Sequence, residues 1–219
     1  MDFRFPWLHQ AGAAVLVAAT LALLPAASFA QSDPRVLPPK GSQKKLPEAP
    51  AKLPKVGNDR TKGLDFLFGA LKAAPDEASA RHVEARIWAT WLQTPSDTAA
   101  LLMSRAKAAM DAQKADVALK LLDALIRLKP DYIEAWNRRA TLYYLKNDYE
   151  RSLQDIQQVL SREPRHFGAL AGLGMIMQDL GDEKRALEAF RKALTINPYL
   201  EKVPDMVKSL TEKVEGRDI

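Results

Sequence analysis

Few side chains in this sequence have the type and spacing that a catalytic or metal site needs. The chain contains three histidines and no cysteine, which excludes disulfides, cysteine-based zinc sites and cysteine nucleophiles. His9 lies close to the N-terminus, and His82 and His166 each stand without a second ligand at metal-binding spacing. We therefore expect His82 and His166 to be ordinary residues at the solvent edge.

The glycines, serines and acidic residues form no recognisable catalytic motif either. Gly168, Gly172 and Gly174 fall inside a helical period rather than after a strand, so they do not form a phosphate-binding loop. No Gly-x-Ser-x-Gly nucleophile elbow occurs, and the carboxylates are scattered at salt-bridge spacing. The sequence thus predicts a protein that is not an enzyme and holds no metal or cofactor. An enzyme subunit or small-molecule binder stays as a minor alternative.

The strongest signal in the sequence is a repeat. Pro130, Pro164 and Pro198 are evenly spaced, and the segments that end at each proline align without a gap. A fixed period of about 34 residues indicates a solenoid of small units. Apolar residues recur at helical spacing on both sides of a central turn, so each unit is predicted to be two helices.

Particular positions of the unit have a predicted structural role. Asn147 and Gly181 occupy the central turn, because both residue types tolerate the left-handed backbone of a helix C-terminus. Each proline ends the second helix because it lacks the helical N–H donor. Small residues are expected where the two helices approach closely, at Ala106, Ala140 and Gly174.

This pattern resembles the tetratricopeptide repeat, and the first unit departs from it with Leu102 and Ala109 at two signature positions. The middle and third units carry the resemblance through Trp136, Ala140, Tyr143 and Pro164, and through Gly174, Gly181, Ala186, Phe190, Ala193 and Pro198. The resemblance implies an all-α fold, a right-handed α-solenoid of helix-turn-helix repeats with a C-terminal capping helix. The chain also looks like the small exported repeat proteins of Gram-negative bacteria.

Five segments follow from composition and period. They are a secretory signal peptide (1–30), a Pro/Lys-rich linker (31–62), a degenerate hairpin (63–96), three repeats within 97–199 (approximately 99–132, 133–166 and 167–200), and a capping helix with a tail (200–219).

The N-terminal segment has the features of an export signal. Arg4 precedes an apolar run from Ala11 to Leu24, and small residues at Ser28 and Ala30 suit signal peptidase. The run is short and is followed by Pro25, so it would span a bilayer poorly. We expect cleavage after Ala30 and a periplasmic protein, with an uncleaved membrane anchor as the alternative.

The positive charge of the chain lies in the predicted linker. Residues 31–62 hold eight basic and three acidic side chains, which accounts for the net charge of +5, and the rest of the chain is neutral. A neutral repeat domain disfavours nucleic-acid binding. The linker is interpreted as a solvated spacer, with weak attraction to anionic lipid headgroups or acidic wall polymer as the second interpretation.

Residues 63–96 are predicted to form a further helix pair. Shifting the repeat frame back by one unit places Phe68 opposite Leu102, and Trp88 and Trp91 opposite Leu122 and Leu125. We expect a degenerate repeat that stacks on the first unit as an N-terminal cap. The apolar segment at residues 87–91 is expected to be core, with a binding patch as the alternative.

The function is expected to reside in a binding groove. In proteins that this one resembles, the first helix of each repeat lines a concave face. The corresponding positions are Met103, Lys107, Met110, Glu134, Asn137, Arg138, Thr141, Tyr144, Gly168, Ala171, Met175, Gln178 and Asp179. The carboxylate clamp of chaperone-binding members is not expected, because Gly168 and Gly172 stand where basic residues would be needed.

The resulting hypothesis is a non-enzymatic periplasmic scaffold or adaptor that binds a peptide segment of another envelope protein in its groove. A membrane-anchored structural component of the envelope, with the basic Pro-rich stretch as its stalk, is the alternative. Because repeat units stack through nearest-neighbour contacts, an exposed terminal face would also allow self-association.

Overall fold

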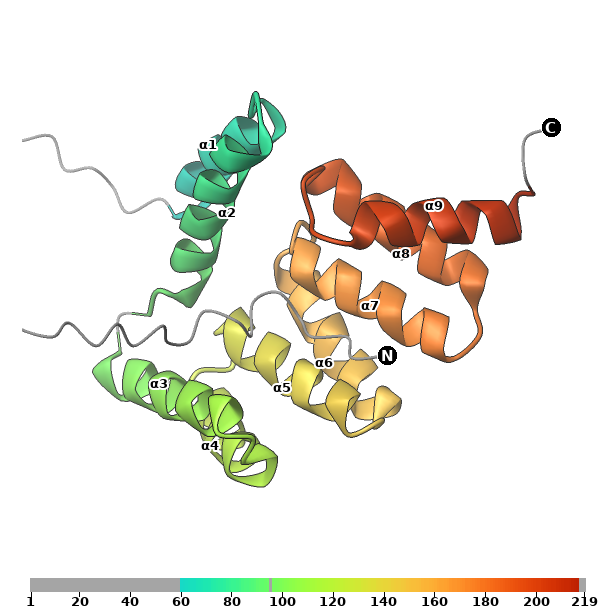
Figure 1. Ribbon diagram of the computed structural model, residues 1–219. Helices are drawn as coiled ribbons and strands as arrows, with labels where there is room; N and C mark the ends of the chain where they lie inside the picture. The colour runs from blue at the N-terminus through green and yellow to red at the C-terminus, as the bar shows by residue number, and fades with distance from the viewer. Residues whose placement is uncertain (1–59, 95, 217–219) are drawn as a thin grey trace, which may run out of the picture. The chain divides into compact units, whose positions relative to one another are not determined.

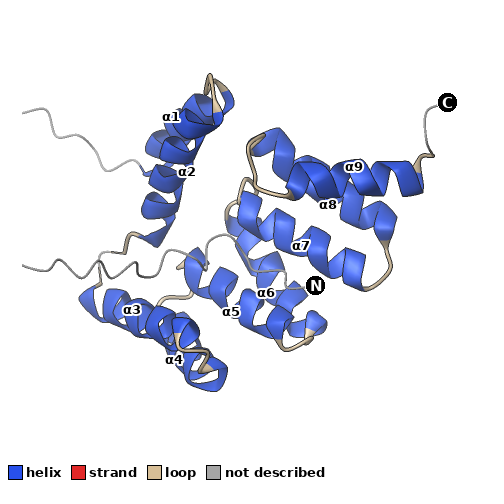
Figure 2. Ribbon diagram, in the orientation of Figure 1, coloured by secondary structure: helices blue, strands red, loops and turns tan. Residues whose placement is uncertain are grey.

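The computed structural model describes residues 60–94 and 96–216, and every regular element in these ranges is an α-helix (Figures 1 and 2). The helices are α1 (Arg60–Lys72), α2 (Glu77–Leu92), α3 (Asp97–Asp111), α4 (Ala115–Leu128), α5 (Ile133–Leu145), α6 (Tyr149–Arg162), α7 (Phe167–Asp179), α8 (Glu183–Ile196) and α9 (Val203–Val214). Among them, none combines the length and the apolar character that a membrane span requires. The predicted signal peptide and most of the predicted linker lie outside the described residues, and α1 begins at Arg60, inside the predicted linker.

Three helix pairs follow the repeat interval, namely α3–α4, α5–α6 and α7–α8. The residue at the turn of each pair has a left-handed backbone, with φ of 57° at Gln113, 57° at Asn147 and 78° at Gly181. The next N–H then bonds back to the end of the first helix, as from Asp148 N to Tyr143 O at 2.9 Å. The predicted turns are confirmed, and the first pair makes its turn with a glutamine.

The second helix of each pair ends where its proline predicts, and two of the three begin with a side-chain cap. Asp148 and Asp182 are N-caps whose carboxylates accept the N–H groups of Arg151 and Arg185. In α4 the equivalent position is Lys114, which makes no side-chain cap. All three second helices end just before their proline, where the missing donor stops the helix.

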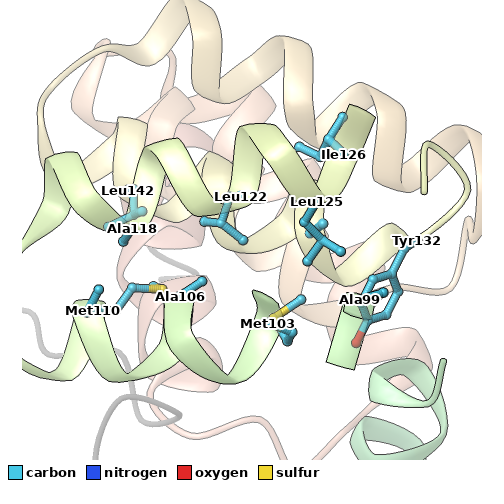
Figure 3. Packing of buried hydrophobic residues seen from close by; sticks show 12 residues of the cluster. Ala99, Met103, Ala106, Met110, Ala118, Leu122, Leu125, Ile126, Tyr132 and Leu142 are labelled. Carbon is cyan, nitrogen blue, oxygen red and sulfur yellow. The ribbon is translucent and has the colours of Figure 1, made fainter. Parts of the chain in front are cut away.

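The two helices of each pair approach closely at the predicted small residues. Ala106 and Ala140 are buried, and a side chain at Gly174 would place its Cβ 2.6 Å from the ring of Phe190. Around Ala106, large apolar residues such as Leu122 form the core between α3 and α4. Figure 3 shows α3 and α4 interlocking in this way.

Arg139 ties three helices together with its guanidinium group. It donates from α5 to Asp155 of α6 at 2.7 and 2.8 Å, and to Asp123 of α4 at 2.7 Å. The side chain of Asp155 is only 3% exposed, and its burial raises the pKa of its carboxyl group although Arg139 opposes that rise. The same pairing raises the pKa of Arg139, so the link between successive repeats stays charged.

Helix α9 covers the C-terminal end of the last pair by packing on α8. Its apolar face buries Val203 and Leu210, and ion pairs from Arg191 to Glu215 and from Lys213 to Glu183 border that face. The predicted closing helix is therefore present, and it starts at Val203 rather than at residue 200.

Candidate functional site

The α1–α2 hairpin packs chiefly on the edge of the array, and only Leu92 at the end of α2 lies against the core around α3 and α4, where a preceding repeat would stack. Its partners are the loops that join one repeat to the next and the helix starts that follow them. Tyr132 donates its hydroxyl to Leu92 O at 2.7 Å, and Asn197 donates its side-chain N–H to Glu84 at 3.0 Å. We call these loops the junctions; they are residues 129–132, 163–166 and 197–202.

At the middle junction the contact is aromatic. The ring of Trp91 stacks on His166 with a centroid separation of 4.1 Å and an interplanar angle of 14°. Trp88 meets the rings of His166 and Phe167 edge-on at 5.4 Å. Beside them, Arg165 lies 4.3 Å above the ring of Phe68. The apolar segment at residues 87–91 therefore forms core, as expected, but it packs against the junctions instead of the first repeat.

The burial of His166 corrects the expectation that both repeat-domain histidines lie at the solvent edge. His82 is exposed, whereas His166 is fully buried. The Nδ1 atom of His166 accepts the N–H of Ala169 at 3.0 Å, so it caps α7. Because Nδ1 is an acceptor, Nε2 carries the hydrogen and donates it to Glu134 Oε1 at 2.8 Å.

Several predicted groove residues are not groove surface. Met103 and Met110 belong to the core between α3, α4 and α5, where Figure 3 shows them pointing toward the leucines of α4. Glu134 is 1% exposed and is held by His166, and its other oxygen lies 3.9 Å from Nε of Arg138. Glu134 lies in the first turn of α5, and its partner His166, at the start of α7, is itself stacked against Trp91 of α2.

Asn137 and Thr141 are also buried, because α5 and α7 approach each other directly. Gly168 and Gly172 of α7 line the space between the two helices, although a Cβ at Gly168 would meet Trp88 of α2 and a Cβ at Gly172 would meet Ile156 of α6. The residues enclose a small hollow of about 20 Å³, enough for one water molecule. Tyr144 lies at the rim of this hollow.

Solvent still reaches part of the predicted groove: Arg138, Gly168 and Ala171 are half-buried in the first halves of their helices, and the more exposed positions lie further along the first helices. Lys107 and Gln178 are exposed, and Tyr144 and Met175 are half-buried. Tyr144 donates its hydroxyl to Asp179 at 2.8 Å, which bridges α5 to α7. Burial and this carboxylate raise the pKa of Tyr144 above its ordinary value, so the hydroxyl stays a donor. We call Tyr144, Met175, Gln178 and Asp179 the rim patch.

The sequence contains one feature that indicates a covered loop at each junction, although the helical periodicity does not reveal it. Tyr132, His166 and Leu200 occupy equivalent positions in successive units, and all three meet the α1–α2 hairpin. A repeat loop is ordinarily solvated, so aromatic or apolar residues at its end indicate that something covers the loop. Within the part of the chain that is described, no group of three acidic or histidine side chains is placed to hold a metal ion.

Comparison with known proteins gives the same picture of the repeats. A family model described as "Tetratricopeptide repeat" matches residues 103–156 and 146–201. A TPR repeat-containing protein of Rhizobium etli is 40% identical over 153 residues, covering 70% of this chain and 75% of the relative. Sperm-associated antigen 1 of Rattus norvegicus is 30% identical over 129 residues, which cover 58% of this chain but 14% of that protein.

Solved structures share the fold at lower sequence identity. The Sgt2 TPR domain from Aspergillus fumigatus superposes with a TM-score of 0.52 at 22% identity, covering 56% of this chain and 82% of that domain. The first TPR of Spaghetti (RPAP3), bound to an HSP90 peptide, gives 0.52 at 14% identity over 56% of this chain and 97% of that one. The helices, the repeat and the extended match to the Rhizobium etli relative show together that this chain belongs to the tetratricopeptide repeat family, an all-α solenoid family of protein–protein interaction modules.

Proposed function

We propose that this protein is an exported, noncatalytic adaptor that binds a peptide segment of another envelope protein at the rim patch. The observation that carries the proposal is the bridge from Tyr144 to Asp179, which holds an aromatic ring, a thioether and polar groups together at the solvent edge of α5 and α7. Met175 supplies an adaptable apolar contact, and Gln178 supplies amide donors and an acceptor.

The neighbouring hollow restricts which peptide fits. It takes one water-sized group, so a small side chain or a bridging water would occupy it, while larger peptide side chains rest on Tyr144 and Met175. Peptides in two related structures, the HSP90 peptide on Spaghetti (RPAP3) and the Hsp70 complex of yeast Sti1, support a peptide as the ligand. A carboxylate clamp is not part of the proposal, because Gly168 leaves no basic group here and faces Trp88.

The test is a capture experiment with residues 31–219 as bait on solubilised envelope extract. The variant bait carries Met175→Lys and Gln178→Glu, which place charges on the rim patch and leave the fully buried core residues unchanged. The matched control carries Lys192→Glu on α8, an exposed position away from the patch. A protein retained by the wild type and the control but lost by the variant supports the proposal. Equal retention by all three baits would refute it.

The location of the protein is part of the proposal and has its own test. An export signal over residues 1–30 motivates it. N-terminal sequencing of the protein from the envelope fraction should start at Gln31. A chain that keeps Met1 and sediments with membranes would refute cleavage and favour the anchored structural component.

A further inference from the structure

The N-terminal face of the first repeat is an uncovered apolar surface. Leu101 of α3 is 52% exposed, and Val117 and Leu128 of α4 are 49% and 46% exposed. Together with Leu121 and Ala124, the α4 residues are spaced four, three and four apart, so they form a single stripe along the helix. We call this surface the entry face.

The later repeats show what covers an equivalent face in this chain. In the second repeat, α4 lies against α5 and supplies Asp123 to Arg139 at 2.7 Å. Arg139 takes its second carboxylate from its own hairpin, through Asp155. The element that covers the second repeat is therefore an amphipathic helix, α4. It makes apolar contacts and presents one carboxylate to the arginine of the repeat that it covers.

The first repeat has the arginine but lacks both acids. Arg105 lies one repeat unit before Arg139, is exposed, and makes no hydrogen bond or ion pair with the described residues. The position of Asp155 is taken by Leu121, and the position of Asp123 by Ala89 on α2. Since α2 packs on the junctions, it does not cover Arg105.

We propose that the entry face docks an amphipathic helix of a partner protein, whose carboxylate pairs with Arg105 as Asp123 pairs with Arg139. Apolar residues of that helix cover Leu101, because its counterpart in the second repeat, Ala135, is fully buried against α4, whereas the counterparts of Val117 and Leu128 stay exposed there. At the other end of the array α9 already occupies the terminal face, so the entry face is the open end of the described repeats. The proposal goes beyond the rim patch and does not depend on it.

The probe is a fluorescein-labelled synthetic peptide with the sequence of residues 113–130, because this is the helix that covers the equivalent face of the second repeat. Fluorescence anisotropy measures its binding to the full chain. Arg105→Glu should weaken binding by about tenfold or more, and tenfold corresponds to about 1.4 kcal/mol. A peptide carrying Asp123→Arg should bind the Arg105→Glu protein better than the unchanged peptide does.

Two control variants and one further variant assign the binding to the entry face. Arg86→Glu makes the same charge reversal at an exposed position of α2 and should leave peptide binding unchanged. Met175→Lys alters the rim patch and should leave it unchanged too, so failure of the adaptor proposal and failure of this one are distinguishable. Leu101→Ser should weaken binding, because it removes the apolar part of the contact.

Three results would overturn the proposal. The first is absence of binding, or equal binding by Arg105→Glu. The second is concentration-dependent self-association of the full chain in sedimentation velocity that Arg105→Glu abolishes, which would make a second copy the occupant. The third is rapid disulfide formation between Ala89→Cys and Arg105→Cys in this otherwise cysteine-free chain, which would make the chain's own α2 the occupant.

Discussion

Replacing His166 by alanine should destabilise the repeat domain far more than the same change at His82. His166 is fully buried, and its strongest contacts are with the N–H of Ala169, with Glu134 and with the stacked ring of Trp91. Alanine keeps none of them. His82 is exposed on α2, and it serves as the matched control.

The magnitude follows from the contacts. Loss of the N-cap on α7 costs about 1 kcal/mol. Loss of the stacked ring pair costs about 1 kcal/mol beyond the buried area. Leaving the buried Glu134 carboxyl without its donor costs about 1–3 kcal/mol. Because the three contacts share one side chain, the sum of roughly 3–5 kcal/mol is an upper range for the change in unfolding free energy.

Urea denaturation followed by far-UV circular dichroism measures this change. The midpoint should fall for His166→Ala at an unchanged slope, and His82→Ala should leave it close to the wild type. A second variant, Trp91→Ala, should reduce the further effect of His166→Ala, because the stack is already lost. A loss below about 1 kcal/mol for His166→Ala, or the same loss for His82→Ala, would refute the edge packing of α2.

Three further predictions use the same assay. Gly174→Ala should destabilise the protein by about 1–3 kcal/mol, because the added methyl group would overlap the ring of Phe190. Gly172→Ala is the control: its nearest neighbour would be 3.6 Å away, so it should be neutral or stabilising. Equal effects of the two changes would refute the close approach of α7 and α8 at Gly174. Gln113→Gly should raise stability by up to about 1 kcal/mol, since the left-handed backbone costs glutamine more than glycine; a loss would show that the turn is not left-handed. Arg139→Met should destabilise by about 3 kcal/mol at pH 7, because it leaves Asp155 buried and unpaired. Burial raises the pKa of the Asp155 carboxyl group, so folding favours its protonated form. The stability that this form contributes is lost as the pH rises through that pKa. The loss of unfolding free energy caused by Arg139→Met should therefore be smaller at pH 4 than at pH 7.

The family and the repeat architecture could be predicted because they depend on local patterns. Helix periodicity, the turn residues and the prolines act within one unit, and the unit recurs at a fixed interval. The close approach at Gly174 and the left-handed turn at Asn147 are likewise consequences of residue size and backbone preference at single positions. Each of these predictions is confirmed by the structure.

The placement of the α1–α2 hairpin could not be predicted from the sequence. The repeat frame puts Trp91 opposite Leu125, and this alignment suggests stacking on the first repeat. In the structure Trp91 instead stacks on His166 and meets Phe167, at the junction between the second and third repeats. The face of the first repeat and the junctions both offer apolar residues to the hairpin. Which of them it packs against depends on three-dimensional fit, and a periodic sequence pattern does not predict that fit.

The candidate site could be predicted only in part, for the same reason. The repeat frame located the first-helix positions, and Tyr144 and Gln178 are reached by solvent among them. Whether such a position is groove or core depends on how close neighbouring first helices come, and Asn137 is buried where α5 and α7 approach each other. The sequence by itself determined the repeating helices and their family, since these follow from local periodicity. Only the tertiary structure decided which faces stay open, because that depends on contacts between segments far apart in the chain.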